Sequence, residues 1–208
     1  MSKQKIFNFN FKNNTNEFDY YVNQTNFYAF NNLINNNSKF SFLYGPKKSG
    51  KSYLSKIWLY KNSAIKFNSN YKLFIDNKNN ILIDELSLFD QEKVFHLVNN
   101  CILNDLKILI TSRNKLNEIK FKYVDLSSRL KTFSYLEIYQ PDDEMLVSIL
   151  TKLLVQKQFI INSNEIFEYI LRRVNRSYQG IYDIVNKLDI LSLEKKRQLT
   201  IPLIKEIL

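Results

Sequence analysis

The sequence predicts an α/β fold, a parallel sheet sandwiched by helices, followed by a small all-helical subdomain. Between residues 40 and 138, short apolar runs without polar alternation, typical of strands buried on both faces, alternate with helical patterns. After Pro141 only helical patterns follow. With 208 residues, of which 45% are apolar, the chain is long enough to bury one core and to carry an appendage.

The expected elements follow the chain in a simple order. Strands are expected at the short apolar runs, residues 40–44, 64–67, 81–83, 107–110 and 135–138. Helices are expected where apolar residues recur on one face, at about residues 25–34, 51–60, 87–103, 142–158, 162–174, 177–193 and from 200 onward. Thr25 is expected to be the N-cap of the first helix. The expected organisation is an extended N-terminal arm over 1–17, an α/β core over 18–140 and a helical subdomain over 141–208.

The composition excludes several classes of protein. Three glycines exclude collagen-like and Gly-rich low-complexity chains, and one cysteine cannot make an internal disulfide, so a reducing, cytoplasmic compartment is expected. No stretch approaches about 20 apolar residues, so no membrane span is expected. Most of the +10 net charge lies in residues 38–139, which hold 17 basic and 9 acidic residues. Either a nucleic-acid surface or an Asn- and Lys-rich background explains that excess.

The expected strand at 40–44 runs directly into a glycine-containing loop and a helix. The loop and the start of the helix read Gly45, Pro46, Lys47, Lys48, Ser49, Gly50, Lys51, Ser52 and Tyr53. This spacing is that of a phosphate-binding loop, whose backbone N–H groups converge on an anion at a helix N-terminus. Lys51 is expected to reach the β- and γ-phosphates, and the Ser52 hydroxyl to bind Mg²⁺. The sequence therefore predicts a site for ATP or ADP with Mg²⁺.

Polar residues follow the buried strands at 81–83 and 107–110. Asp84 is expected to hold Mg²⁺ together with Ser52, and Glu85 to orient or deprotonate the attacking water. Thr111 ends the neighbouring strand, where its hydroxyl would contact the γ-phosphate; a plain polar strand end explains it equally well. Arg129 stands before the last strand, and its spacing alone favours a solvated side chain.

The order of these motifs resembles the AAA+ domain of the bacterial replication initiator DnaA, and more closely its shorter relative Hda. The segments that carry the resemblance are GPKKSGKS, ILIDE, LITSR and DLSSRL, and then a helical segment opening QPDDEMLVSILTKLLVQKQ. The resemblance covers about residues 17–208. It implies an AAA+ core with a helical lid, an adenine nucleotide between them, and a cytoplasmic role in regulating replication initiation. Further residues resemble the segment that frames the adenine in that family: Glu17, Phe18, Tyr21, Val22 and Asn26.

The same resemblance implies a partner and roles for two arginines. Arg129 matches the arginine finger of the family, which would complete the ATP site of a partner DnaA and promote hydrolysis there. Gln179 stands where the family has a sensor arginine, and Arg176, one turn earlier, is the expected substitute beside the nucleotide. Weak hydrolysis in the chain's own site is therefore expected. Because the sequence stops at Leu208, sequence-specific origin binding through a following domain is not expected.

The N-terminal residues and the basic core leave further expectations open. Hda-like proteins carry an N-terminal peptide that binds the sliding clamp, and its glutamine and apolar side chains are matched by Gln4, Ile6, Phe7 and Phe9. An arm packed on its own domain is the alternative. A nucleotide-dependent homo-oligomer and non-specific DNA contact also stay open. The alternative function is a DNA-associated AAA+ ATPase or helicase-loader-type adaptor that binds DNA through its basic core.

Overall fold

A computed structural model describes residues 20–35, 38–68, 78–161, 163 and 165–208. The described strands form one parallel five-stranded sheet in the order β2-β3-β4-β1-β5. Their bounds are β1 Phe40–Tyr44, β2 Ile65–Lys66, β3 Ile81–Ile83, β4 Ile108–Ser112 and β5 Ser134–Glu137. The carboxyl ends of β1 and β4 are neighbours, yet the chain leaves them toward opposite sides of the sheet. Such a switch point is where α/β sheets bind ligands.

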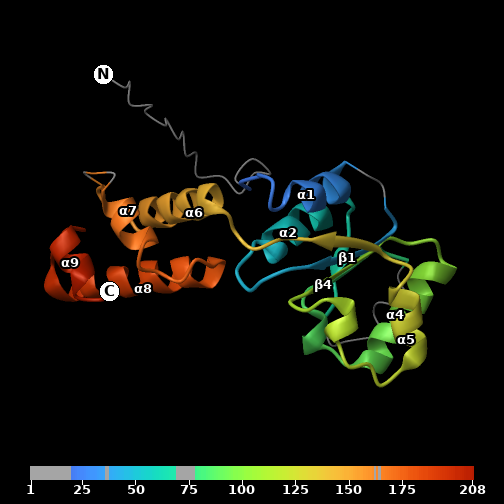
Figure 1. The fold of residues 1–208 in the computed structure, drawn as a ribbon. Helices are drawn as coiled ribbons and strands as arrows, with labels where there is room; N and C mark the ends of the chain where they lie inside the picture. Colours follow the sequence, from blue (N-terminus) through green and yellow to red (C-terminus); the bar gives the residue numbers. More distant parts are fainter. Residues whose placement is uncertain (1–19, 36–37, 69–77, 162, 164) are drawn as a thin grey trace.

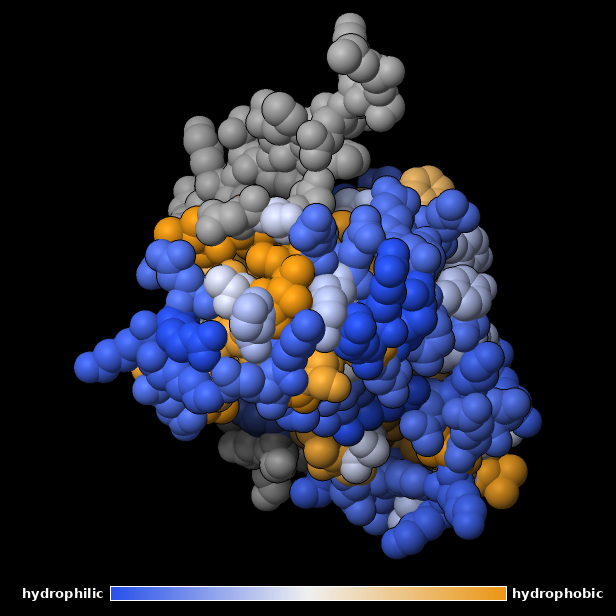
Figure 2. Space-filling model, turned by 60° about the vertical axis from the view of Figure 1, so that its left-hand side comes forward, coloured by the Kyte–Doolittle hydropathy of each residue, from blue (hydrophilic) through white to orange (hydrophobic). Residues whose placement is uncertain are grey.

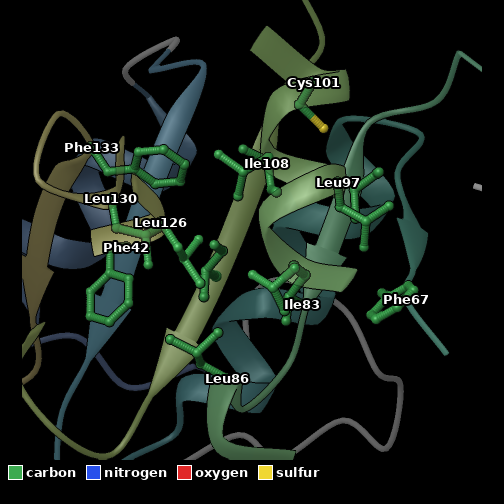
Figure 3. Packing of buried hydrophobic residues seen from close by; sticks show 14 of the residues in the cluster. Phe42, Phe67, Ile83, Leu86, Leu97, Cys101, Ile108, Leu126, Leu130 and Phe133 are labelled. Atoms are coloured by element: carbon green, nitrogen blue, oxygen red, sulfur yellow. The ribbon is translucent and has the colours of Figure 1, made fainter. Parts of the chain in front are cut away.

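The apolar strands are buried on both faces, which explains why they show no polar alternation. Ile108 and Ile110 of β4 face one core cluster, whereas Leu109 between them faces the other. The first cluster packs against α4 (Gln91–Leu103) and α5 (Val124–Leu130), and Figure 3 shows its side chains gathered beside the strands. The second packs against α1 (Phe27–Ile34) and α2 (Lys51–Lys61). The result is a three-layer sandwich with helices on both faces of the sheet (Figure 1).

The C-terminal helices form a hydrophobic cluster of their own. They are α6 Asp143–Gln156, α7 Glu165–Leu171, α8 Tyr178–Lys195 and α9 Ile201–Lys205. Local capping determines where two of them begin, because the Asp142 carboxylate accepts from the Met145 N–H at 2.8 Å and the Ser177 hydroxyl from the Gly180 N–H at 3.1 Å. The four helices stand beside the sheet rather than over it (Figure 1).

Three expectations about the helices need correction. Thr25 is not an N-cap: α1 begins after Asn26, and the Thr25 N–H donates instead to the Asn23 side chain. The expected helix at 87–103 is divided into a short 3-10 turn, η2 (Leu86–Leu88), and α4, because Asp90 caps a new helix by accepting from two backbone N–H groups. Helix α5, which carries Arg129, and the 3-10 turn η3 (Leu116–Glu118) were not expected.

A small set of polar contacts joins the core to the C-terminal helices. The Asn23 side-chain amide donates to both carboxylate oxygens of Asp142, at 2.8 and 2.9 Å. The hydroxyl of buried Tyr178 donates to the Tyr139 carbonyl at 3.2 Å. Seen from the side of these helices, the surface is mostly hydrophilic, with smaller hydrophobic patches (Figure 2). Among the helices in the described part of the chain, none has the length and apolarity that crossing a membrane requires.

Candidate functional site

The loop between β1 and α2 has the backbone of an anion cradle. Gly50 ends the loop at a φ of +90° and is the N-cap of α2. A Cβ atom there would lie 2.9 Å from Cε2 of Tyr20, so glycine is needed for both conformation and space. A Cβ at Gly45 would lie 2.6 Å from the Ile138 carbonyl oxygen. The loop therefore keeps the N-terminus of α2 open to a ligand.

Two buried polar side chains point to what the loop binds. Lys51 is 7% exposed, and its ammonium donates to the carbonyls of Gly45 at 2.6 Å and Pro46 at 2.7 Å. Burial lowers the pKa of Lys51 to about 8. The hydroxyl of Ser49 is buried and has no hydrogen-bond partner among the described residues. A buried cation and an unpaired hydroxyl in one loop fit an anionic group with oxygen acceptors, such as a phosphate.

Asp84 lies at the carboxyl end of β3, facing the loop. Its Oδ1 accepts from the Thr111 hydroxyl at 3.0 Å and the Ser52 hydroxyl at 3.2 Å, while the Lys66 ammonium lies 2.7 Å from Oδ2. Burial raises the pKa of Asp84, but the Lys66 ammonium and the two hydroxyls outweigh it, and the pKa lies below its usual value. Asp84 is therefore an ionised carboxylate contacted from three other elements of the core, β2, β4 and α2.

Glu85, the next residue, is contacted through both its backbone and its side chain. Its backbone has a φ of +73°, unusual for a residue other than glycine, and its N–H donates to the Thr111 hydroxyl at 2.7 Å. One carboxylate oxygen accepts from the Ser87 hydroxyl at 2.9 Å, and the other lies 3.1 Å from Nε of Arg113. Both oxygens of Glu85 are thus engaged by the chain itself.

Two adjoining cavities open over this loop. One, of about 500 Å³, is lined by the loop and by the ends of β2, β3 and β4. The other, of about 240 Å³, lies between the core and helices α6 and α8, and its walls include Tyr20, Tyr178 and Tyr182. The two share the loop residues 48–50 together with Tyr53 and Tyr182. The first cavity is polar and basic and the second is partly aromatic, so the pair fits a ligand with a phosphate chain and a planar ring.

The structure brings most of the predicted site residues together and leaves two arginines outside. The first cavity is lined by Lys47, Lys48, Ser49, Gly50, Lys51, Ser52, Tyr53, Asp84, Glu85 and Thr111 among the predicted residues. Gly45 and Pro46 contribute their carbonyls to Lys51 instead. Arg176 is an exposed residue that pairs with Asp143, and it is not among the described residues lining either cavity, so its place beside the nucleotide stays a prediction. Arg129 lies on α5, with its guanidinium 5.7 Å from the centre of the Phe95 ring.

Sequence reasoning missed three side chains of the site. Lys66 and Arg113 pair with Asp84 and Glu85, and Tyr182 supplies a wall from α8 where Arg176 was expected. Lys66 ends a strand directly beside β3, so a correct strand order would have drawn attention to it. The expected adenine-framing residues Glu17 and Phe18, and the expected clamp peptide over residues 4–9, lie outside the described residues.

The C-terminal helices match a known family. Residues 143–208 match the family model of the lid domain of Hda. Among solved structures, domain III of the Thermotoga maritima replication initiation protein DnaA matches this chain with a TM-score of 0.79 and 16% identity, over 95% of this chain and 96% of that one. The fold is the AAA+ fold of DnaA domain III. AMPPCP-bound DnaA from Aquifex aeolicus matches with a TM-score of 0.65 and 17% identity, over 84% of this chain and 65% of that one.

Two curated proteins are related to this DnaA-like AAA+ chain in sequence. An uncharacterised protein of Haemophilus influenzae is 26% identical over 215 residues, 88% of this chain and 91% of that protein. The chromosomal replication initiator protein DnaA of Buchnera aphidicola subsp. Cinara cedri is 28% identical over 153 residues, 71% of this chain. That match spans 34% of the Buchnera protein, so about a third of its length corresponds to this chain.

The site beside the loop has oxygen donors of the kind that Mg²⁺ prefers. The Ser52 hydroxyl and the Asp84 carboxylate face each other at 3.2 Å beside the phosphate loop, and both are hard ligands. These two residues fit a magnesium ion in donor type and would hold it next to a bound phosphate. Such an ion neutralises charge on the phosphate oxygens when it is bound.

Proposed function

We propose that this chain is an adenine-nucleotide-binding AAA+ regulator of chromosomal replication initiation that acts, like Hda, on DnaA in the cytoplasm. The observation that carries the proposal is the match of residues 143–208 to the Hda lid domain, on a core with the fold of DnaA domain III. The chemical step that it promotes is hydrolysis of ATP bound to the initiator. The guanidinium of Arg129 enters the partner's site and stabilises the charge that develops on the transferred phosphoryl group.

The chain's own cavities support ADP or ATP as the ligand. Its phosphates would lie against the loop, where the N–H groups of α2, the buried ammonium of Lys51 and the unpaired Ser49 hydroxyl converge. Its base would lie in the second cavity, against Tyr53 and the residues of α6 and α8. Because this second cavity lies between core and lid, nucleotide binding would couple the position of the lid to the ligand.

The hydrogen bonds of Glu85 support weak hydrolysis in the chain's own site. A carboxylate that orients an attacking water must be free to turn an oxygen toward it. Both oxygens of Glu85 are engaged, by Ser87 and Arg113, and its side chain is 14% exposed. We therefore assign to this site the binding of nucleotide rather than its turnover.

The location of Arg129 supports a role in trans. Helix α5 packs on α4 in the layer opposite α2, so the arginine is remote from the N-terminus of α2, which bears the phosphate loop. Its contact with the Phe95 ring holds a half-buried guanidinium by a cation–π interaction. A fixed arginine on a face turned away from its own site fits a finger for a neighbouring AAA+ subunit.

The deciding experiment measures ATP hydrolysis by DnaA with the sliding clamp and DNA present. Wild type is expected to stimulate hydrolysis, and Arg129→Ala to lose at least about a hundredfold of that stimulation, since arginine fingers contribute about 10³ or more to the rate. Arg172→Ala, which removes an exposed lid arginine paired with Glu168, is the matched control and is expected to stimulate like wild type. ADP affinity of each variant checks that it is folded. Equal stimulation by wild type and Arg129→Ala contradicts the assignment.

A second variant tests whether nucleotide controls the partner interaction. Lys51→Ala removes the buried ammonium of the phosphate loop and is expected to abolish ADP binding. If DnaA stimulation persists in this variant, nucleotide does not gate the interaction and the chain acts as a scaffold. We also propose that the N-terminal peptide binds the sliding clamp through Gln4, Ile6, Phe7 and Phe9. Deleting residues 1–10 is expected to abolish clamp binding.

A further inference from the structure

Lys66 reaches from the edge of the sheet to the acidic side of the nucleotide site. It ends β2 and pairs in register with Leu82 of β3, two residues before Asp84. The lysine stem can therefore follow β3 to its carboxyl end, where the ammonium lies 2.7 Å from Oδ2 of Asp84. The position depends on the pairing of two strands, so it is built into the fold.

Lys66 completes the hydrogen bonding of Asp84. One carboxylate oxygen accepts from Thr111 and Ser52, and the other is covered by the lysine ammonium. The Asp84 side chain is only 15% exposed, which leaves little access to solvent. A divalent cation bound at Ser52 would share Asp84 with a positive charge already in place, and the two charges would repel each other.

The lining of the first cavity is basic enough to balance phosphates without a metal. Among the described residues that line it, five side chains are basic and two are acidic, an excess of three positive charges. The basic ones are Lys47, Lys48, Lys51, Lys66 and Arg113; the acidic ones are Asp84 and Glu85. Both carboxylates are paired, with Lys66 and Arg113, so neither presents an unbalanced negative charge to a phosphate chain.

We infer that the ammonium of Lys66 replaces the charge of Mg²⁺ beside Asp84, so that the site binds ADP or ATP without requiring a divalent cation. The inference rests on the proposed nucleotide binding and specifies whether that binding depends on Mg²⁺. A nucleotide held in this way stays bound when free Mg²⁺ is scarce, and a metal ion held by Ser52 and Asp84 is bound less tightly because Lys66 shares the carboxylate. Lys66 acts through Asp84 and the bound phosphates, and its charge determines whether nucleotide binding depends on Mg²⁺.

The test is titration calorimetry of ADP with wild type, Lys66→Met and Lys66→Arg, each in excess Mg²⁺ and in EDTA. Methionine keeps most of the apolar stem of Lys66 and removes its charge, whereas arginine keeps the charge. The Kd of wild type and of Lys66→Arg is expected to change less than about threefold between the two conditions. The Kd of Lys66→Met is expected to be at least about tenfold weaker in EDTA than in Mg²⁺, a difference of about 1.4 kcal/mol. Lys93→Met, on the exposed face of α4, is the matched control and is expected to behave as wild type.

The outcomes separate this inference from the proposed function. If wild type binds ADP in Mg²⁺ and loses tenfold or more of its affinity in EDTA, Lys66 does not replace the metal, while nucleotide binding itself stands. If Lys66→Met is as independent of Mg²⁺ as wild type, the charge of Lys66 is not the cause and the inference also fails. If wild type binds ADP in neither condition, the proposed nucleotide site is wrong and the inference falls with it.

Discussion

Removing the hydroxyl of Tyr178, in the variant Tyr178→Phe, is expected to weaken the junction between core and lid. Tyr178 opens helix α8 and is 1% exposed. Its hydroxyl donates to the Tyr139 carbonyl at 3.2 Å and lies 3.5 Å from the Thr25 hydroxyl. Burial raises the pKa of Tyr178 above its usual value, so the hydroxyl keeps its proton and can donate at neutral pH. Phenylalanine keeps the ring and its packing, so the change isolates the hydrogen bond.

The expected loss is about 1–2 kcal/mol in the free energy of unfolding. A neutral hydrogen bond contributes about 1 kcal/mol net, and a carbonyl left without its donor adds up to about as much again. For a chain of this size, that corresponds to a fall of about 2–8 °C in Tm, at about 2–4 °C per kcal/mol. Tyr178→Ala also removes a buried ring and is expected to cost about 3–5 kcal/mol.

Urea denaturation followed by circular dichroism measures these differences. Tyr60→Phe is the control, because Tyr60 is 79% exposed and its variant is expected to unfold like wild type. If Tyr178→Phe has the same midpoint as Tyr60→Phe, the hydroxyl contributes nothing to the junction and the reasoning is refuted. The Tyr178 ring is buried in the second core cluster, so if Tyr178→Phe is as unstable as Tyr178→Ala, the ring does not stabilise that cluster as expected.

Gly50→Ala places a Cβ against the Tyr20 ring at a φ of +90°, and calorimetry is expected to show at least about tenfold weaker ADP binding; unchanged affinity would contradict it. Burial lowers the pKa of Lys51 to about 8, whereas a bound phosphate favours its ammonium, so ADP affinity is expected to fall by up to about tenfold per unit as the pH rises above 8; a flat profile between pH 7 and pH 10 speaks against it. Asp142→Ala removes the α6 cap together with the contacts to Asn23 and is expected to cost about 1–2 kcal/mol in urea denaturation, and Asp142→Asn, which keeps one acceptor oxygen, is expected to recover part of it. Burial raises the pKa of Cys101 to about 12, so iodoacetamide at neutral pH is expected to modify the folded protein at least about 100-fold more slowly than the urea-unfolded chain.

The sequence alone predicted the features of this protein that depend on residues close together along the chain. The strand, loop and helix around Gly45–Ser52 were predicted because they form one unit of residues that are close together along the chain. The strands predicted at 81–83 and 107–110 were found, the second as Ile108–Ser112, because burial on both faces demands an unbroken apolar run. The succession of strands and helices likewise predicted the α/β layers and the all-helical C-terminal part, and the fold confirms both.

Only the tertiary structure decided how the charges of the site are arranged. Lys66 meets Asp84 because β2 lies beside β3 in the sheet, and no pattern along the chain encodes that neighbour. Arg113 meets Glu85 because β3 and β4 end at the same edge. Arg176, expected by resemblance as a substitute for a sensor arginine at Gln179, pairs with Asp143 on α6, a contact that the sequence pattern does not encode. Local sequence determines which groups are present, whereas the order of strands and the packing of the lid determine which of them meet, because those contacts join residues distant along the chain.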